Sequence, residues 1–115
     1  MQRKMNTQLP NDLYLFGFAN KGTRIDTTKL TDLRELIRKE FKATYRLCST
    51  RTSYGLKHIA ESLLGRYVAN GEFIAAMLLE GFKCQRIGDS PNACFNLSER
   101  GMKELQSKSI HNSKY

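Results

Sequence analysis

The chain has 115 residues, 40% of them hydrophobic, and its 19 Lys and Arg outnumber 11 Asp and Glu, which gives a formal net charge of +8. This length predicts one domain that buries a core without disulfides, and five Tyr and six Phe exclude a disordered tail. No stretch approaches the roughly 20 consecutive apolar residues needed to span a bilayer, and the basic first residues lack the apolar core of a signal peptide. We therefore expect a cytoplasmic protein with no membrane partner.

Three cysteines, Cys48, Cys84 and Cys94, occur at unrelated spacings. An odd number of cysteines is typical of reduced thiols in a reducing compartment. No pair has the C-x-x-C spacing of a structural zinc site, although Cys84 and Cys94 could face each other across a hairpin. We expect ordinary core thiols rather than a disulfide or a metal site, and no cofactor.

Residues 1–26 form a polar lead that we expect to be partly flexible, with an apolar segment at 12–18 that is either a strand or a buried stretch. A first helix is predicted at 27–42, where apolar residues recur at helical spacing after a cap at Asp26 or one of the next two threonines. The remaining face of this helix is basic. Residues 43–50 are rich in strand formers and predict a short strand.

Two short helices are predicted next, at 54–64 and 71–80. The first begins after Ser53, a favourable N-cap, and its apolar residues follow the i, i+3, i+4, i+7, i+8 pattern. Asn70 is predicted to cap the second helix, and Gly81 to end it, because glycine accepts the left-handed conformation that follows a helix. Two short helices with a tight connection form a helix-turn-helix unit.

A hairpin is predicted from strands at 82–87 and 93–97, because the five residues between them all favour turns. Ser98 is predicted to cap a last helix at 98–107, and residues 108–115 are expected to form a flexible tail. The chain is therefore expected to have an α+β fold.

The order of these elements resembles a winged helix-turn-helix domain of the MarR-like kind over residues 27–107. Residues 56–65 resemble the second helix of that module, residues 73–82 its third helix with the trailing Gly-Phe, and residues 96–101 the strand end and turn after its wing. Residues 53–97 also resemble small uncharacterised proteins of phages and conjugative elements. Because winged helices bind proteins as well as DNA, the resemblance bears on the fold more than on function.

The resemblance implies a third helix in the major groove and a wing along the backbone or the minor groove. Residues 71–80 contain no Arg, Lys, Asn or Gln, although reading base edges needs such donors and acceptors. We therefore expect contacts dominated by phosphates or by DNA shape. The candidate nucleic-acid-binding residues are Arg51, Lys57, Arg66, Asn70, Lys83 and Arg86.

The third helix also offers a candidate protein interface. Its inward side is predicted to hold Phe73 or Ile74, together with Met77 and Leu78. Its outward side is predicted to hold Glu72, Ala75 or Ala76, and Leu79, and an exposed apolar strip marks a protein contact. Two tyrosines, Tyr54 and Tyr67, flank the second helix, where they either stack on bases or, as is commoner, pack at its rim.

We expect that the protein is not an enzyme, since the sequence shows no phosphate loop and no nucleophile with an identifiable base. One function that fits is a regulator or accessory factor of a phage or mobile element that binds duplex DNA, which the positive charge favours. The other is an inhibitor of a host defence nuclease, like an anti-CRISPR protein, that docks on an acidic or nucleic-acid-associated protein. The donor-poor third helix favours this second function, and a homodimer is compatible with both.

Overall fold

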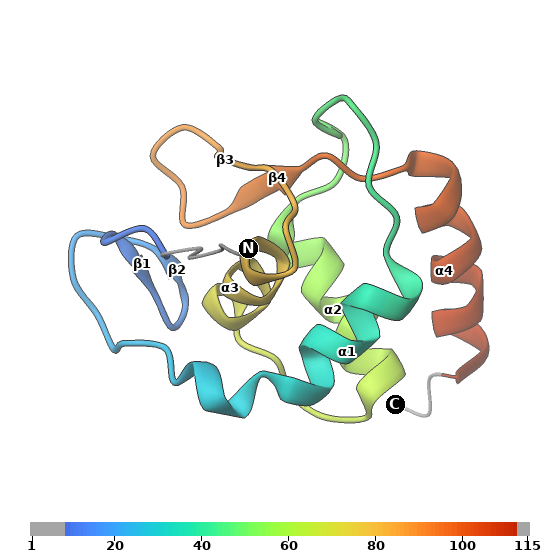
Figure 1. Ribbon diagram of the computed structural model, residues 1–115, viewed down its shortest axis with the longest axis horizontal. Helices are drawn as coiled ribbons and strands as arrows, with labels where there is room; N and C mark the ends of the chain where they lie inside the picture. Colours follow the sequence, from blue (N-terminus) through green and yellow to red (C-terminus); the bar gives the residue numbers. More distant parts are fainter. Residues whose placement is uncertain (1–8, 113–115) are drawn as a thin grey trace, which may run out of the picture.

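The computed structural model describes residues 9–112. Its elements are β1 (Leu13–Tyr14), β2 (Gly17–Phe18), a short 3-10 helix η1 (Thr27–Lys29), α1 (Thr31–Glu40), α2 (Ser53–Leu64), α3 (Asn70–Leu79), β3 (Cys84–Arg86), β4 (Ala93–Phe95) and α4 (Glu99–Asn112). The strands form two antiparallel hairpins, β1–β2 and β3–β4, which lie near α3, while α4 lies at the opposite end of the molecule (Figure 1). The α+β fold class is confirmed. No helix within the described range has the length and apolar character to cross a membrane.

The third helix, α3, is the centre of the core. All five residues of 73–77 are fully buried, and the helix packs against α1, α2 and both hairpins. The ring of Phe73 lies 5.8 Å from that of Phe41 and 5.9 Å from that of Phe95, measured between centroids. After its first turn the helix is apolar on every side, so it has no polar stripe to present to water.

The predicted first helix lies in the expected region but is divided. The 3-10 helix η1 and the helix α1 are separated by Leu30, and α1 ends at Glu40, two residues before the predicted end. The side chain of Asp26 accepts a hydrogen bond from the backbone N–H of Thr28 at 3.1 Å, so Asp26 is the cap.

The cap predicted for α2 is wrong by one residue. The hydroxyl oxygen of Thr52 accepts a hydrogen bond from the backbone N–H of Gly55 at 3.3 Å, and Ser53 is the first residue of the helix. The buried hydroxyl oxygen of Ser53 accepts a bond from the N–H of Ala93 at 3.1 Å. Ser53 therefore joins α2 to β4, which explains why a polar side chain is buried at this point.

The strand predicted at 43–50 is wrong. The segment runs along the outer edge of β4, where Thr44 N–H donates to the carbonyl oxygen of Asn96 at 2.8 Å and Cys48 N–H to that of Phe95 at 2.7 Å. Four residues on this segment thus span a single step on its partner, from Asn96 just after β4 to Phe95 within it, so residues 45–47 loop outward. Apart from an isolated bridge between Ala43 and Leu97, no ladder forms. Tyr45 in this loop is 97% exposed.

The predicted C-terminal hairpin is confirmed. Cys84 pairs with Phe95, and Gln85 with Cys94, so the two thiols point to opposite faces of the hairpin and do not face each other. Ser98 caps α4 as predicted, since its hydroxyl oxygen accepts a bond from Gly101 N–H at 3.1 Å. The helix continues to Asn112, five residues beyond the predicted end.

The N-terminal hairpin is docked on the start of α3. Of the predicted lead, residues 1–8 lie outside the described range, and segment 12–18 forms the strand pair β1–β2, which is only partly buried, since Phe16 at its turn is 63% exposed. Leu13 and Phe18 belong to the core, and Gly71 N–H donates to the carbonyl oxygen of Leu15 at 2.9 Å. A Cβ atom at position 71 would overlap the carbonyl oxygen of Tyr14, so only glycine allows this approach.

Candidate nucleic-acid interface

The predicted outward face of α3 does not face outward. Ala75 and Ala76 are fully buried, and Leu79 is half-buried against the core. Glu72 is used locally, because its carboxylate accepts a hydrogen bond from the backbone N–H of Ala69 at 3.0 Å. The prediction of an exposed strip is wrong because both hairpins and two helices cover α3. A helix covered in this way has no free face for a groove of DNA.

The last residue of the third predicted helix, Glu80, balances the basic face of α1. Its carboxylate accepts bonds from Arg34 at 2.7 Å and from Arg38 at 2.9 Å. Burial opposes ionisation of Glu80, but the hydrogen bonds from the two arginines outweigh it and lower the pKa of the carboxyl. Part of the basic face predicted from the sequence is therefore neutralised within the fold.

Lys57 is buried in an ion pair. Its side-chain nitrogen lies 3.0 Å from the carboxylate of Glu61, and only 4% of the residue is exposed. Burial opposes ionisation of Glu61, but bonds from the Val68 N–H, Lys57 and His58 lower the pKa of its carboxyl. A phosphate would have to break this pair to reach Lys57, so the residue is not an available phosphate contact.

Asn70 ties the two hairpins together instead of capping α3. Its side-chain nitrogen donates to the carbonyl oxygens of Phe16 and Pro91 at 3.4 and 3.3 Å, and to the side-chain oxygen of Asn92 at 3.0 Å. The helix begins at Asn70 itself, with Ala69 as the residue before it. Asn70 is 5% exposed, so its position does not suit contact with DNA.

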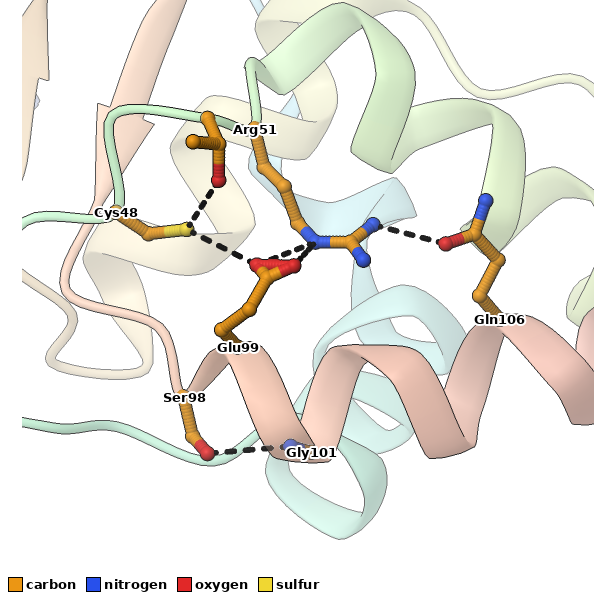
Figure 2. Close-up of polar contacts among 7 residues, drawn as sticks. Cys48, Arg51, Ser98, Glu99, Gly101 and Gln106 are labelled. Carbon is orange, nitrogen blue, oxygen red and sulfur yellow. Dashed lines mark hydrogen bonds and ion pairs between the residues drawn. The ribbon is translucent and has the colours of Figure 1, made fainter.

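Arg51 is held between α4 side chains. Figure 2 shows its guanidinium between Glu99 and Gln106, with Nε donating to the carboxylate of Glu99 at 2.9 and 3.1 Å and Nη1 to the amide oxygen of Gln106 at 3.1 Å. The thiol of Cys48 donates to the same carboxylate at 3.6 Å. This network fixes the loop before α2 on α4, so Arg51 has a structural role.

Arg66 and Arg86 are also engaged. Arg66 makes two hydrogen bonds to the carboxylate of Asp32, at 2.9 and 2.7 Å. These bonds are the main reason that the pKa of the Asp32 carboxyl lies below its ordinary value. Arg86 donates to the backbone oxygens of Ser90 and Asp89 at 2.8 and 3.0 Å, which closes the turn of the β3–β4 hairpin.

Lys83 differs from the other predicted residues, because its side chain is exposed and forms no salt bridge with another described residue. Three further exposed cations with the same property lie on segments that hydrogen bonds join to that of Lys83. They are Lys42 and Arg46 in the segment beside β4, and Arg100 in the first turn of α4. We call these four residues the basic edge. Of these four, only Lys83 is a candidate binding residue from the sequence. Lys42 is predicted only as part of the basic face of the first helix, and no local pattern marks Arg46 or Arg100.

Asn96 brings the segments of the basic edge together. Its side-chain oxygen accepts from Lys83 N–H at 2.7 Å, and its side-chain nitrogen donates to the carbonyl oxygen of Thr44 at 3.0 Å. Next to it, Ser98 N–H donates to the carbonyl oxygen of Lys42 at 2.9 Å, which attaches the start of α4 to the same place. One buried amide thus positions three chain segments, each of which carries an exposed cation.

The basic edge is suited to binding anions. Its charges are not paired within the described structure, and Glu99, the acid next to Arg100 in the sequence of α4, is occupied by Arg51. Exposed unpaired cations attract phosphate at long range and contact it without a preceding ion pair having to break. Among residues 9–112, no three His, Cys, Asp or Glu side chains lie close enough together to hold a metal ion.

No protein-family model, curated protein or solved structure matches this chain. The resemblance to MarR-like winged helices and to phage and conjugative-element proteins therefore stays a prediction. The expectations of a non-enzymatic and cytoplasmic protein stay predictions as well.

Proposed function

We propose that the protein binds nucleic acid through the phosphate backbone, with the basic edge as the contact surface. The observation that carries this proposal is the assembly of Lys42, Arg46, Lys83 and Arg100, unpaired and exposed, around the buried amide of Asn96. The net charge of +8 adds long-range attraction for a polyanion. Contacts of this kind are independent of base sequence.

The finer fold that we propose is a winged helix whose DNA contact has moved. The order α1, α2, α3 and β3–β4 supports the proposal, with β3–β4 in the position of the wing. The burial of α3 and the docking of β1–β2 on its start are departures from that fold. Duplex DNA would therefore lie along the basic edge, and α3 would read no bases.

An accessory role in a phage or mobile element fits this contact better than sequence-specific repression does, because no described base-reading donor is exposed on α3. The alternative, an inhibitor of the anti-CRISPR type that grips a protein with α3, loses its predicted surface, since Ala75 is fully buried. Such an inhibitor would need a different face.

Charge reversal tests the proposal. The triple variant Lys42→Glu, Arg46→Glu and Lys83→Glu removes most of the basic edge. A control with Lys21→Glu, Lys29→Glu and Lys39→Glu changes the net charge equally at exposed sites elsewhere. Fluorescence anisotropy with a labelled random-sequence duplex should show that wild-type affinity falls roughly 100-fold between about 50 and 200 mM salt if four phosphates are neutralised.

We expect the edge variant to lose more than about 100-fold in affinity at about 50 mM salt, and the control much less, because direct contacts exceed the general effect of charge. Circular dichroism of both variants shows whether the fold is retained. Equal losses of duplex affinity in the two variants would contradict a contact at the basic edge. A wild-type affinity that does not change with salt concentration would contradict phosphate contacts altogether.

A further inference from the structure

Three large aromatic side chains that are more than half exposed line one hollow of about 390 Å³. Phe16 comes from the turn between β1 and β2, Tyr54 from the first turn of α2, and Tyr67 from the connection between α2 and α3. Segments distant in the sequence thus place their rings at one concave point. We call it the aromatic hollow, and its volume lies within the range of small-molecule sites.

A buried cation fixes the two tyrosines. The side-chain nitrogen of Lys57 lies 4.6 Å from the ring centroid of Tyr67 and 5.4 Å from that of Tyr54. The same nitrogen is held by the carboxylate of Glu61 at 3.0 Å. Because Lys57 is buried and paired, it is a fixed point on which both rings rest. A platform that is already ordered loses little conformational entropy when a ligand stacks on it.

The hollow also has a polar side with spare acceptor capacity. The side-chain nitrogen of Asn70 faces three acceptors, two of which are backbone carbonyls, so the orientation of the amide is determined. The side-chain oxygen of Asn70 is buried and has no hydrogen-bond partner among the described residues. An unpaired buried acceptor is rare in folded proteins, and a donor on a ligand that displaces the local contacts of Asn70 would satisfy it.

These features select a flat, uncharged ring that carries N–H groups. The charges of Lys57 and Glu61 cancel, so the hollow itself does not attract a phosphate. Tyrosine and phenylalanine rings stack on any base, and a nucleobase presents N–H donors at its edge. We propose that the aromatic hollow binds one unpaired nucleobase of a nucleic-acid strand. This inference rests on the proposed function, in which the basic edge binds the phosphates.

Two single strands of about 12 nucleotides test it, one with bases and one of the same length in which every nucleotide is abasic, so that only the bases differ. Wild-type protein should bind the base-bearing strand about fivefold or more tightly at low salt, as expected for one stacked base. The double variant Tyr54→Leu and Tyr67→Leu should lose this preference and keep the affinity for the abasic strand.

Tyr45→Leu is the matched control, because Tyr45 is an exposed tyrosine outside the hollow. Tyr45→Leu should keep the preference for the base-bearing strand. A variant set in which Tyr45→Leu loses this preference and the double variant keeps it would overturn the proposal. If the double variant unfolds, two single variants replace it. Tyr67→Phe keeps the aromatic ring and should retain the preference for the base-bearing strand, whereas Tyr67→Leu should weaken it. Equal wild-type affinity for the two strands would overturn the nucleobase site and leave the proposed function standing. No binding to either strand or to the duplex would overturn both.

Discussion

The substitution Gly71→Ala tests how firmly β1–β2 is docked on α3. Gly71 lies in the first turn of α3, and alanine within a helix is normally more stable than glycine by roughly 0.5–1 kcal/mol. At this position the new Cβ would overlap the carbonyl oxygen of Tyr14 and lie 2.7 Å from that of Leu15. Both oxygens belong to the backbone, so no rotation of a side chain relieves the overlap and the hairpin must move away.

The size of the effect follows from what the movement breaks. The hydrogen bond from Gly71 to Leu15 contributes about 1 kcal/mol. Leu13 and Phe18 are 2% and 7% exposed, and a side chain of this kind contributes about 1.5–3 kcal/mol when it is fully buried. The conformational entropy that the freed hairpin regains offsets part of this loss. We therefore expect the free energy of unfolding to fall by roughly 2–5 kcal/mol.

Urea unfolding followed by far-UV circular dichroism measures this change. The control is Gly55→Ala in the first turn of α2, where the new Cβ meets only the Thr52 hydroxyl oxygen, at 3.9 Å. The control should be as stable as wild type or more stable by up to about 1 kcal/mol. Equal stabilities of Gly71→Ala and Gly55→Ala would refute the close approach of the hairpin to α3.

Three further outcomes are expected. Glu61→Gln leaves the Lys57 charge buried without its partner and should cost roughly 3 kcal/mol in urea unfolding at pH 7. Burial opposes ionisation of Glu61, but the hydrogen bonds that Glu61 accepts outweigh it and lower the pKa of the carboxyl below 4.5. The ionised carboxylate therefore stabilises the fold fully above about pH 4.5, and this stabilisation is lost as the pH falls through the lower folded pKa. The stability of Glu61→Gln should lack this pH dependence. Asn96→Ala leaves two backbone groups without partners and should cost about 2–3 kcal/mol in the same assay while weakening duplex binding. Burial raises the pKa of the Cys84 thiol to about 11, so its alkylation at pH 8, followed by mass spectrometry, should be far slower in folded than in urea-unfolded protein.

Local signals in the sequence located most of the elements. The periodicity of α2, the turn residues between β3 and β4, and the Ser98 cap each act over a few residues, and all three are found in the structure. The orientation of α3 was predicted wrongly, because the resemblance to a winged helix implied an exposed face. Its composition, apolar on every side of 73–77, indicates burial and was the better guide.

The candidate site was harder to predict, because it depends on which charges find partners. Arg66 pairs with Asp32 across 34 positions, and Arg51 with Glu99 across 48. No local pattern reveals such pairs, so the sequence could not show that these arginines are engaged. The converse holds for Lys42 and Arg46, whose association with Lys83 depends on tertiary hydrogen bonds of Asn96.

The salt dependence of duplex binding tests the central claim most directly. Each phosphate that a cation neutralises contributes about −0.9 to the slope of log affinity against log salt concentration. Four contacts at the basic edge predict a wild-type slope of about −3 to −4, and replacing Lys42, Arg46 and Lys83 by alanine should make it less steep by about 3. The alanine control at Lys21, Lys29 and Lys39 should keep the wild-type slope. A slope that changes equally in both variants, or in neither, would contradict the basic edge as the surface that binds nucleic acid.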